Sequence, residues 1–86
     1  MKIKKELIRR EIAGDVILVP VGKTALENNG LFTLNELGGF LWDRLEAAAD
    51  ETDLLRAVLE EYEVSEAEAL EDIRDFLNEL TQMEIL

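Results

Sequence analysis

The spacing of the apolar residues changes once along this chain, and that change limits the folds open to it. Up to about residue 33, apolar residues form short runs bounded by turn-forming residues, which is typical of β-strands. Beyond that point they recur every three or four positions, as on one face of an α-helix. The chain has 86 residues and no internal repeat, so we predict one domain spanning residues 1–86, with strands first and helices after.

The first part of the chain predicts a β-hairpin. Strands are expected at residues 8–12 and 16–21, joined through Ala13-Gly14-Asp15, a compact turn signal. The apolar run Val16-Ile17-Leu18-Val19 predicts a strand that is covered on both faces. Pro20 has no amide hydrogen and is therefore expected near the end of that strand.

The segment Leu31-Phe32-Thr33 is predicted to be a short third strand, which follows a turn signal at Asn28-Asn29-Gly30. It carries no charge and no proline, which are the usual means of protecting a sheet edge. One interpretation is an edge left open, to which an extended peptide can add as a further strand. The other is a short, fully paired strand that leads into a helix, and the residues alone favour this second interpretation.

Three helices are predicted after the strands, each with polar residues at its start and an apolar stripe. The first has Thr33 and Glu36 spaced as a capping box, the second follows Asp50, and the third opens on another capping box, Ser65 and Glu68. The residues expected on the core faces are Leu34, Leu37, Leu41 and Leu45, then Leu54, Leu55, Val58, Leu59 and Tyr62, then Leu70, Ile73, Leu77 and Leu80. A small sheet followed by three short helices favours a winged-helix-like α+β domain.

The first predicted helix contains glycines and aromatic residues that need an explanation. Each glycine of Gly38-Gly39 costs about 1 kcal/mol relative to alanine inside a helix, so the pair predicts close approach of another segment, most simply by internal packing. Trp42 is expected in the core. Phe40 lies off the leucine stripe, so the sequence leaves open whether it is a core residue or an interface anchor.

The side-chain inventory excludes several classes of function. The chain has no cysteine and no histidine, so it lacks disulfides, thiol nucleophiles, imidazole bases and the usual soft-metal ligands. Neighbouring acids such as Glu60-Glu61 and Glu71-Asp72 are interpreted as solvated helix faces. We therefore expect a protein that is not an enzyme and needs no cofactor or metal. No apolar run approaches the ~18 residues of a membrane span, so we expect a cytoplasmic protein.

Charge is unevenly spread along the chain, whose formal net charge is −11. Residues 1–10 carry five basic side chains, whereas residues 43–86 carry fifteen acids against Arg44, Arg56 and Arg74. An acidic surface repels phosphate groups, so nucleic acid is a poor partner for this half of the chain. A basic peptide or a basic protein surface is favoured instead.

Several segments, taken together in order, resemble a known family. They are Gly14-Asp15-Val16-Ile17-Leu18-Val19-Pro20-Val21-Gly22, Asn29-Gly30-Leu31-Phe32-Thr33-Leu34-Asn35-Glu36-Leu37-Gly38, Phe40-Leu41-Trp42 and Leu59-Glu60-Glu61-Tyr62-Glu63-Val64, followed by the acidic third helix and a tail that ends in leucine. Over nearly the whole chain, this set is similar to the PqqD family. The resemblance implies a winged-helix-like domain in which a three-stranded antiparallel sheet packs on three helices.

The resemblance also implies a function. Members of this family act as peptide chaperones, also called recognition elements for ribosomally synthesised and post-translationally modified peptides (RiPPs). They bind the leader segment of a precursor peptide and deliver it to a modifying enzyme, commonly a radical SAM protein. The leader typically adds as a strand beside the third strand, in a groove that the third helix closes.

Carried over to this chain, the resemblance makes Gly30-Leu31-Phe32-Thr33 the strand that pairs with the leader peptide. At 100° per residue, one flank of the third helix holds Ala67, Leu70, Glu71 and Arg74, and the other holds Asp72 and Phe76. We assign peptide binding to the first flank. Because this helix is strongly acidic, we expect the bound peptide to carry Lys or Arg near its strand-forming core.

Two other functions remain open at the level of the sequence. A winged-helix DNA-binding protein would need a basic recognition helix, and the second and third helices contain only Arg56 and Arg74 among many acids. A structural subunit of a larger complex is the other alternative, and the sequence does not exclude it.

Overall fold

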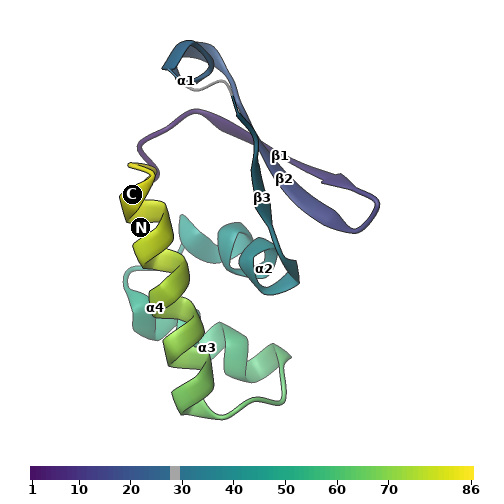
Figure 1. The fold of residues 1–86 in the computed structure, drawn as a ribbon. Coiled ribbons are helices and arrows are strands. Elements are labelled where there is room, and N and C mark those ends of the chain that lie inside the picture. Colours follow the sequence, from purple (N-terminus) through teal and green to yellow (C-terminus); the bar gives the residue numbers. More distant parts are fainter. Residues whose placement is uncertain (28–29) are drawn as a thin grey trace.

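The computed structural model describes residues 1–27 and 30–86 and has the predicted α+β class (Figure 1). In chain order its elements are β1 (Leu7–Ile12), β2 (Asp15–Pro20), α1 (Gly22–Glu27), β3 (Phe32–Leu34), α2 (Glu36–Leu45), α3 (Glu51–Glu61) and α4 (Glu66–Gln82). The three predicted strands and the three predicted helices are confirmed, and α1 is a further helix that the sequence did not predict. Two residues of the turn predicted at Asn28-Asn29-Gly30, Asn28 and Asn29, lie outside the described residues.

The sheet has the strand order β1-β2-β3, and both neighbouring pairs are antiparallel. Ala13 and Gly14 form the two-residue turn between β1 and β2, with φ angles of 52° and 87°. Positive φ at both positions is the type I′ geometry, whose twist matches that of the flanking strands. The turn pairs Ile12 with Asp15 and thereby sets the register of the hairpin.

The short helix α1 connects β2 to β3 and contains a buried polar residue. Thr24 is 4% exposed, and its hydroxyl accepts a hydrogen bond of 2.8 Å from the backbone amide of Glu6. The helix is thereby tied to the segment that precedes β1. Helix α1 has too few apolar residues to form the stripe by which a helix is predicted, and its one large apolar side chain, Leu26, is 87% exposed.

Helices α2, α3 and α4 lie on one side of the sheet (Figure 1). On β2, Val16 and Leu18 are buried, whereas Ile17 and Val19 are only half buried. The prediction that this strand is covered on both faces is therefore wrong. Side chains alternate along a strand, so two of these residues face the helices and the other two face away from them.

The core lies between the helix-facing side of the sheet and the three long helices. The largest fully buried side chains are those of Leu18, Leu41, Leu45, Leu54, Val58, Ile73 and Ile85. On the predicted core faces of α2 and α3, the buried residues are Leu41, Leu45, Leu54 and Val58. Leu59 was predicted there too but is 39% exposed, and Trp42 packs half buried against the same core.

The predicted core face of α4 is only partly correct. Ile73 and Leu80 are buried as expected, but the remaining buried positions are Ala69 and Phe76 in place of Leu70 and Leu77. The helix is therefore rotated by part of a turn from the expected orientation. Leu70 and Leu77 lie half buried at the border of the face, on the side that turns toward α3.

Polar side chains begin the helices, although not always the ones predicted. The capping box predicted for Thr33 and Glu36 is wrong, because Asn35 is the N-cap of α2 and accepts a 2.7 Å hydrogen bond from the amide of Gly38. Thr33 is thereby left in β3. The start predicted at Ser65 is confirmed, since its hydroxyl accepts a 3.1 Å hydrogen bond from the amide of Glu68.

Gly39 allows α2 to approach β2 closely. A Cβ atom at this position would lie 2.6 Å from Cγ2 of Val16, which is shorter than real Cβ contacts. At Gly38 the nearest atoms, of Asn35 and Leu34, would lie 3.1 Å and 3.2 Å away. The predicted internal packing of the glycine pair is confirmed.

The two ends of the chain are held by backbone hydrogen bonds and lie close together (Figure 1). The amino group of Met1 donates to the carbonyl of Leu45 at 2.8 Å, and the amide of Lys4 donates to the carbonyl of Ile85 at 2.7 Å. In the described part of the chain, no helix is long and apolar enough to cross a membrane.

Candidate functional site

The pairing within the hairpin determines which backbone groups of β2 face β3. In a β-turn the amide of the fourth residue donates to the carbonyl of the first, so Asp15 turns its amide toward Ile12 and β1. Successive residues of an antiparallel strand point their amide and carbonyl to alternate sides. Val16 and Leu18 therefore point theirs toward β3.

The same alternation identifies the free backbone groups at the edge of the sheet. Leu34 and Phe32 are opposite the β3-facing residues of β2, so their amides and carbonyls point inward. Thr33 lies between them and points its amide and carbonyl outward. Within residues 1–27 and 30–86, no further strand pairs with this side of β3. The outer edge of β3 is therefore open for hydrogen bonding.

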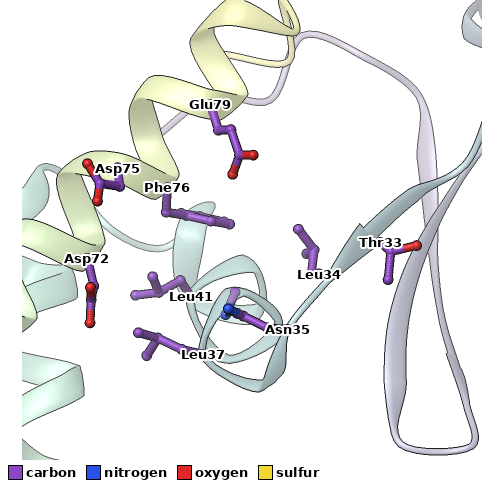
Figure 2. A pocket seen from close by; sticks show the side chains of 10 residues that line it. Thr33, Leu34, Asn35, Leu37, Leu41, Asp72, Asp75, Phe76 and Glu79 are labelled. Carbon is purple, nitrogen blue, oxygen red and sulfur yellow. Dashed lines mark hydrogen bonds between the residues drawn. The ribbon is translucent and has the colours of Figure 1, made fainter.

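A hollow of about 480 Å³ lies beside this edge (Figure 2). β3, the first turns of α2 and one flank of α4 enclose it. The residues that line it are Thr33, Leu34, Asn35, Leu37, Gly38, Leu41, Asp72, Asp75, Phe76 and Glu79. The hollow is thus a groove with a strand edge along one side and a helix along the other.

The floor and the wall of this groove differ in chemistry. The floor is apolar and consists of Leu34, Leu37, Leu41 and Phe76. In Figure 2 the Phe76 ring projects from α4 toward Leu34. The wall is acidic and is defined by the carboxylates of Asp72, Asp75 and Glu79, which α4 presents on one flank. The groove can therefore accept an apolar side chain on its floor and cationic groups at its wall.

The acids of the wall form no ion pair with any residue of the described ranges. The ion pairs of the structure use other acids: Arg74 pairs with Glu51 at 3.1 Å, and Arg9 pairs with Asp43 at 2.7 Å. The bond to Glu51 also raises the pKa of the Arg74 guanidinium. No group of three or more His, Cys, Asp or Glu residues in the described part of the chain is arranged to hold a metal ion.

The structure brings only some of the predicted site residues to the groove. Thr33 lines it, Phe32 is half buried beside it, and Leu31 is 62% exposed just before β3, after the exposed Gly30. The four residues predicted from the third helix do not line it; they are Ala67, Leu70, Glu71 and Arg74. Their contact with a peptide stays a prediction.

The position of Arg74 explains why the expected flank lies elsewhere. Its ion pair with Glu51 shows that this side of α4 turns toward α3, so Asp72 and Phe76 on the opposite flank turn toward β3. Asp75 and Glu79 were not among the residues predicted for the site. Their spacing of three and seven residues from Asp72 could have shown that the three acids share one helix face.

Phe40 is in contact with other residues of the chain and does not line the groove. Its ring meets that of Tyr62 edge to face, with centroids 5.2 Å apart, and the Arg44 guanidinium lies 3.6 Å from its centre. Partial burial raises the pKa of Tyr62, and the nearby carboxylates of Glu36 and Glu61 raise it further. The side chain is half buried, so internal packing accounts for Phe40.

The family model described as coenzyme PQQ synthesis protein D (PqqD) matches residues 15–86. Among solved structures, the chain is similar to TbiB1 in complex with the TbiA(beta) leader peptide, with 28% sequence identity and a TM-score of 0.77. That alignment covers 100% of this chain and 94% of the other. No curated protein sequence matches the chain.

Proposed function

Because this chain belongs to the PqqD family, we propose that it is a non-catalytic adaptor in peptide modification. It binds the leader segment of a ribosomally synthesised precursor peptide and presents the peptide to a modifying enzyme, such as a radical SAM protein or another RiPP maturase. Residues 1–86 act together as one recognition domain, in the cytoplasm where the precursor is made.

The observation that carries this proposal is the open edge of β3 beside a groove with an apolar floor. Sheet edges are normally covered, charged or interrupted by proline, and β3 has none of these protections. The similar structure of TbiB1 is a complex with a leader peptide. Strand addition to the β3 edge is therefore the binding mode that this fold supports best.

In this mode the leader pairs through its backbone with the outward amide and carbonyl of Thr33. Every second side chain of the added strand then points toward α4 and lies over the groove, because side chains alternate along a strand. Backbone pairing supplies affinity, and the groove supplies selectivity. Holding the precursor near the enzyme raises its effective concentration without any chemistry by this chain.

The proposed site combines one predicted segment with a revised helix flank. Leu31, Phe32 and Thr33 remain on the strand side, with Gly30 preceding them. On the helix side, the residues are Asp72, Asp75, Phe76 and Glu79, and the residues first predicted there lie outside the groove.

NMR shift mapping tests this proposal, with the leader segment of a candidate precursor peptide as the ligand. We expect the largest backbone shifts at residues 31–34 and 72–79, and small shifts in β1 and α3. An eight-residue segment of the same precursor, taken from outside its leader, serves as the control peptide. Shifts confined to β1 and α3, or none with any segment of the precursor, would overturn the proposal.

A further inference from the structure

The acidic wall of the groove narrows the class of leader peptide that fits it. We propose that the leader strand places Lys or Arg against Asp72, Asp75 and Glu79, on the same strand face as an apolar side chain that lies over the floor. This inference rests on the proposed function and concerns the same site. It identifies the substrate as a peptide whose helix-facing side chains include Lys or Arg together with an apolar residue.

The dimensions of the wall limit how many cations it can take. From Asp72 to Glu79 the helix advances by seven residues, or about 10.5 Å at 1.5 Å per residue. Side chains on one face of an extended strand are about 6.6 Å apart, twice the rise per residue. Two helix-facing side chains therefore fit along the wall, at positions i and i+2 of the leader, and a third extends beyond it.

The chemistry of the floor and of the wall determines which side chains of the leader fit the groove. Leu41 and Phe76 are buried in the core beneath the groove, and the half-buried Leu34 and Leu37 present apolar surface that offers no hydrogen bond to a polar side chain. The carboxylates at the wall are exposed and, in the described part of the chain, have no cationic partner. Arginine and lysine suit this arrangement because their apolar stems can cover the floor while their charged ends reach the wall.

A charge effect of the whole acidic chain must be separated from an effect of the wall. The variant Asp72→Asn/Asp75→Asn removes two charges from the wall and keeps the size of both side chains. Its matched control is Glu60→Gln/Glu63→Gln, which removes two exposed charges that do not line the groove. Both variants change the net charge by the same amount.

A displayed library of random twelve-residue peptides tests the inference without knowledge of the natural precursor. Peptides are selected on the wild-type chain and on both double variants, and then counter-tested on Thr33→Pro, which blocks the outward amide of the edge. We expect Lys or Arg to be enriched at alternate positions on the wild type and on the control. On Asp72→Asn/Asp75→Asn we expect that enrichment to disappear.

Titration of the best selected peptide gives the size of the effect. At low ionic strength we expect the wall variant to weaken binding roughly fivefold to tenfold, and the control variant less than twofold, because exposed ion pairs are individually weak. Peptides that require the Thr33 edge but show no excess of cations would overturn this inference and leave the proposed function standing. Peptides that bind Thr33→Pro as well as the wild type would overturn both.

Discussion

The sheet has two outer edges, β1 and β3, and they differ in the charges that they carry. β1 carries Arg9, Arg10 and Glu11 along its length, and Arg9 pairs with Asp43 of α2 at 2.7 Å. β3 is shorter and has no charged residue, and the groove lies beside it. Charges on an edge strand oppose pairing with another chain, whereas an uncharged edge permits it. The fold thus closes one edge and leaves the other available.

The difference also shows in what lies beneath each edge. Below β1, the hollow lined by Lys5, Arg9, Asp43 and Glu46 contains charges of both signs. Below β3, the charges of the hollow are all acidic and its floor is apolar. The hollow beside β3 therefore favours a cationic ligand, because no basic residue among those that line it neutralises its acids.

The largest expected effect comes from blocking the outward backbone of β3. Thr33→Pro removes the amide hydrogen that faces the open edge, and we expect leader affinity to fall roughly thirtyfold or more. Glu11→Pro is the matched control, since alternation from Ile12 places its amide on the outer side of β1. We expect it to bind the leader with little change. Calorimetric titration measures both, and circular dichroism checks that both variants are folded.

Proline at position 32 does not serve this purpose. The register places the amide of Phe32 toward β2, so its loss would break the sheet itself. Equal loss of affinity in Thr33→Pro and Glu11→Pro would contradict the distinction between the two edges.

The second effect concerns the helix that supports β3 from below. In Gly39→Ala the new methyl group meets buried Val16, and we expect a loss of about 1–2 kcal/mol in the free energy of unfolding. The better helix propensity of alanine offsets part of the clash. Gly38→Ala makes longer contacts and should lose less. Denaturant unfolding of the two variants measures the difference, and equal stability would show that α2 can move away from β2.

These residues also show how far the sequence could predict the molecule. Periodicity predicted the strands, the three long helices and the buried Leu41, Leu45 and Ile73, because burial imposes a regular spacing. The family resemblance then predicted the edge segment at residues 30–33. Local patterns thus predicted elements and most of the core.

The groove wall could not be predicted in the same way. Its position depends on the rotation of α4 about its axis, and Leu70 and Leu77 fit a core face as well as Ala69 and Phe76 do by spacing alone. Contact with α3 and α2 decides between the two faces, and this contact is a property of the packed fold. The same limit explains α1, which is tied to the segment before β1 by the buried Thr24 and by a hydrogen bond from the amide of Val21 to the carbonyl of Glu6.

A smaller effect is expected in the turn that closes the β1 side of the sheet. Ala13 has φ of 52°, which an alanine adopts at a cost and which asparagine adopts more readily. Ala13→Asn should therefore raise the free energy of unfolding by about 0.5–1 kcal/mol. Because the turn is remote from the groove, leader affinity should not change. Thermal unfolding and peptide titration together check this, and a change in affinity would link the hairpin turn to the binding edge.

The smallest effect is expected from removing the ion pair between Arg9 of β1 and Asp43 of α2. Arg9 and Asp43 have side chains that are 33% and 42% exposed, so their attraction is screened and contributes about 0.2–1 kcal/mol. Asp43→Asn should lower stability by no more than this in low salt, and the loss should vanish at high salt. If charge alone closes the β1 edge, the variant should also begin to bind the leader there, with new NMR shifts in β1. We expect no such shifts, because Arg9, Arg10 and Glu11 still line that edge.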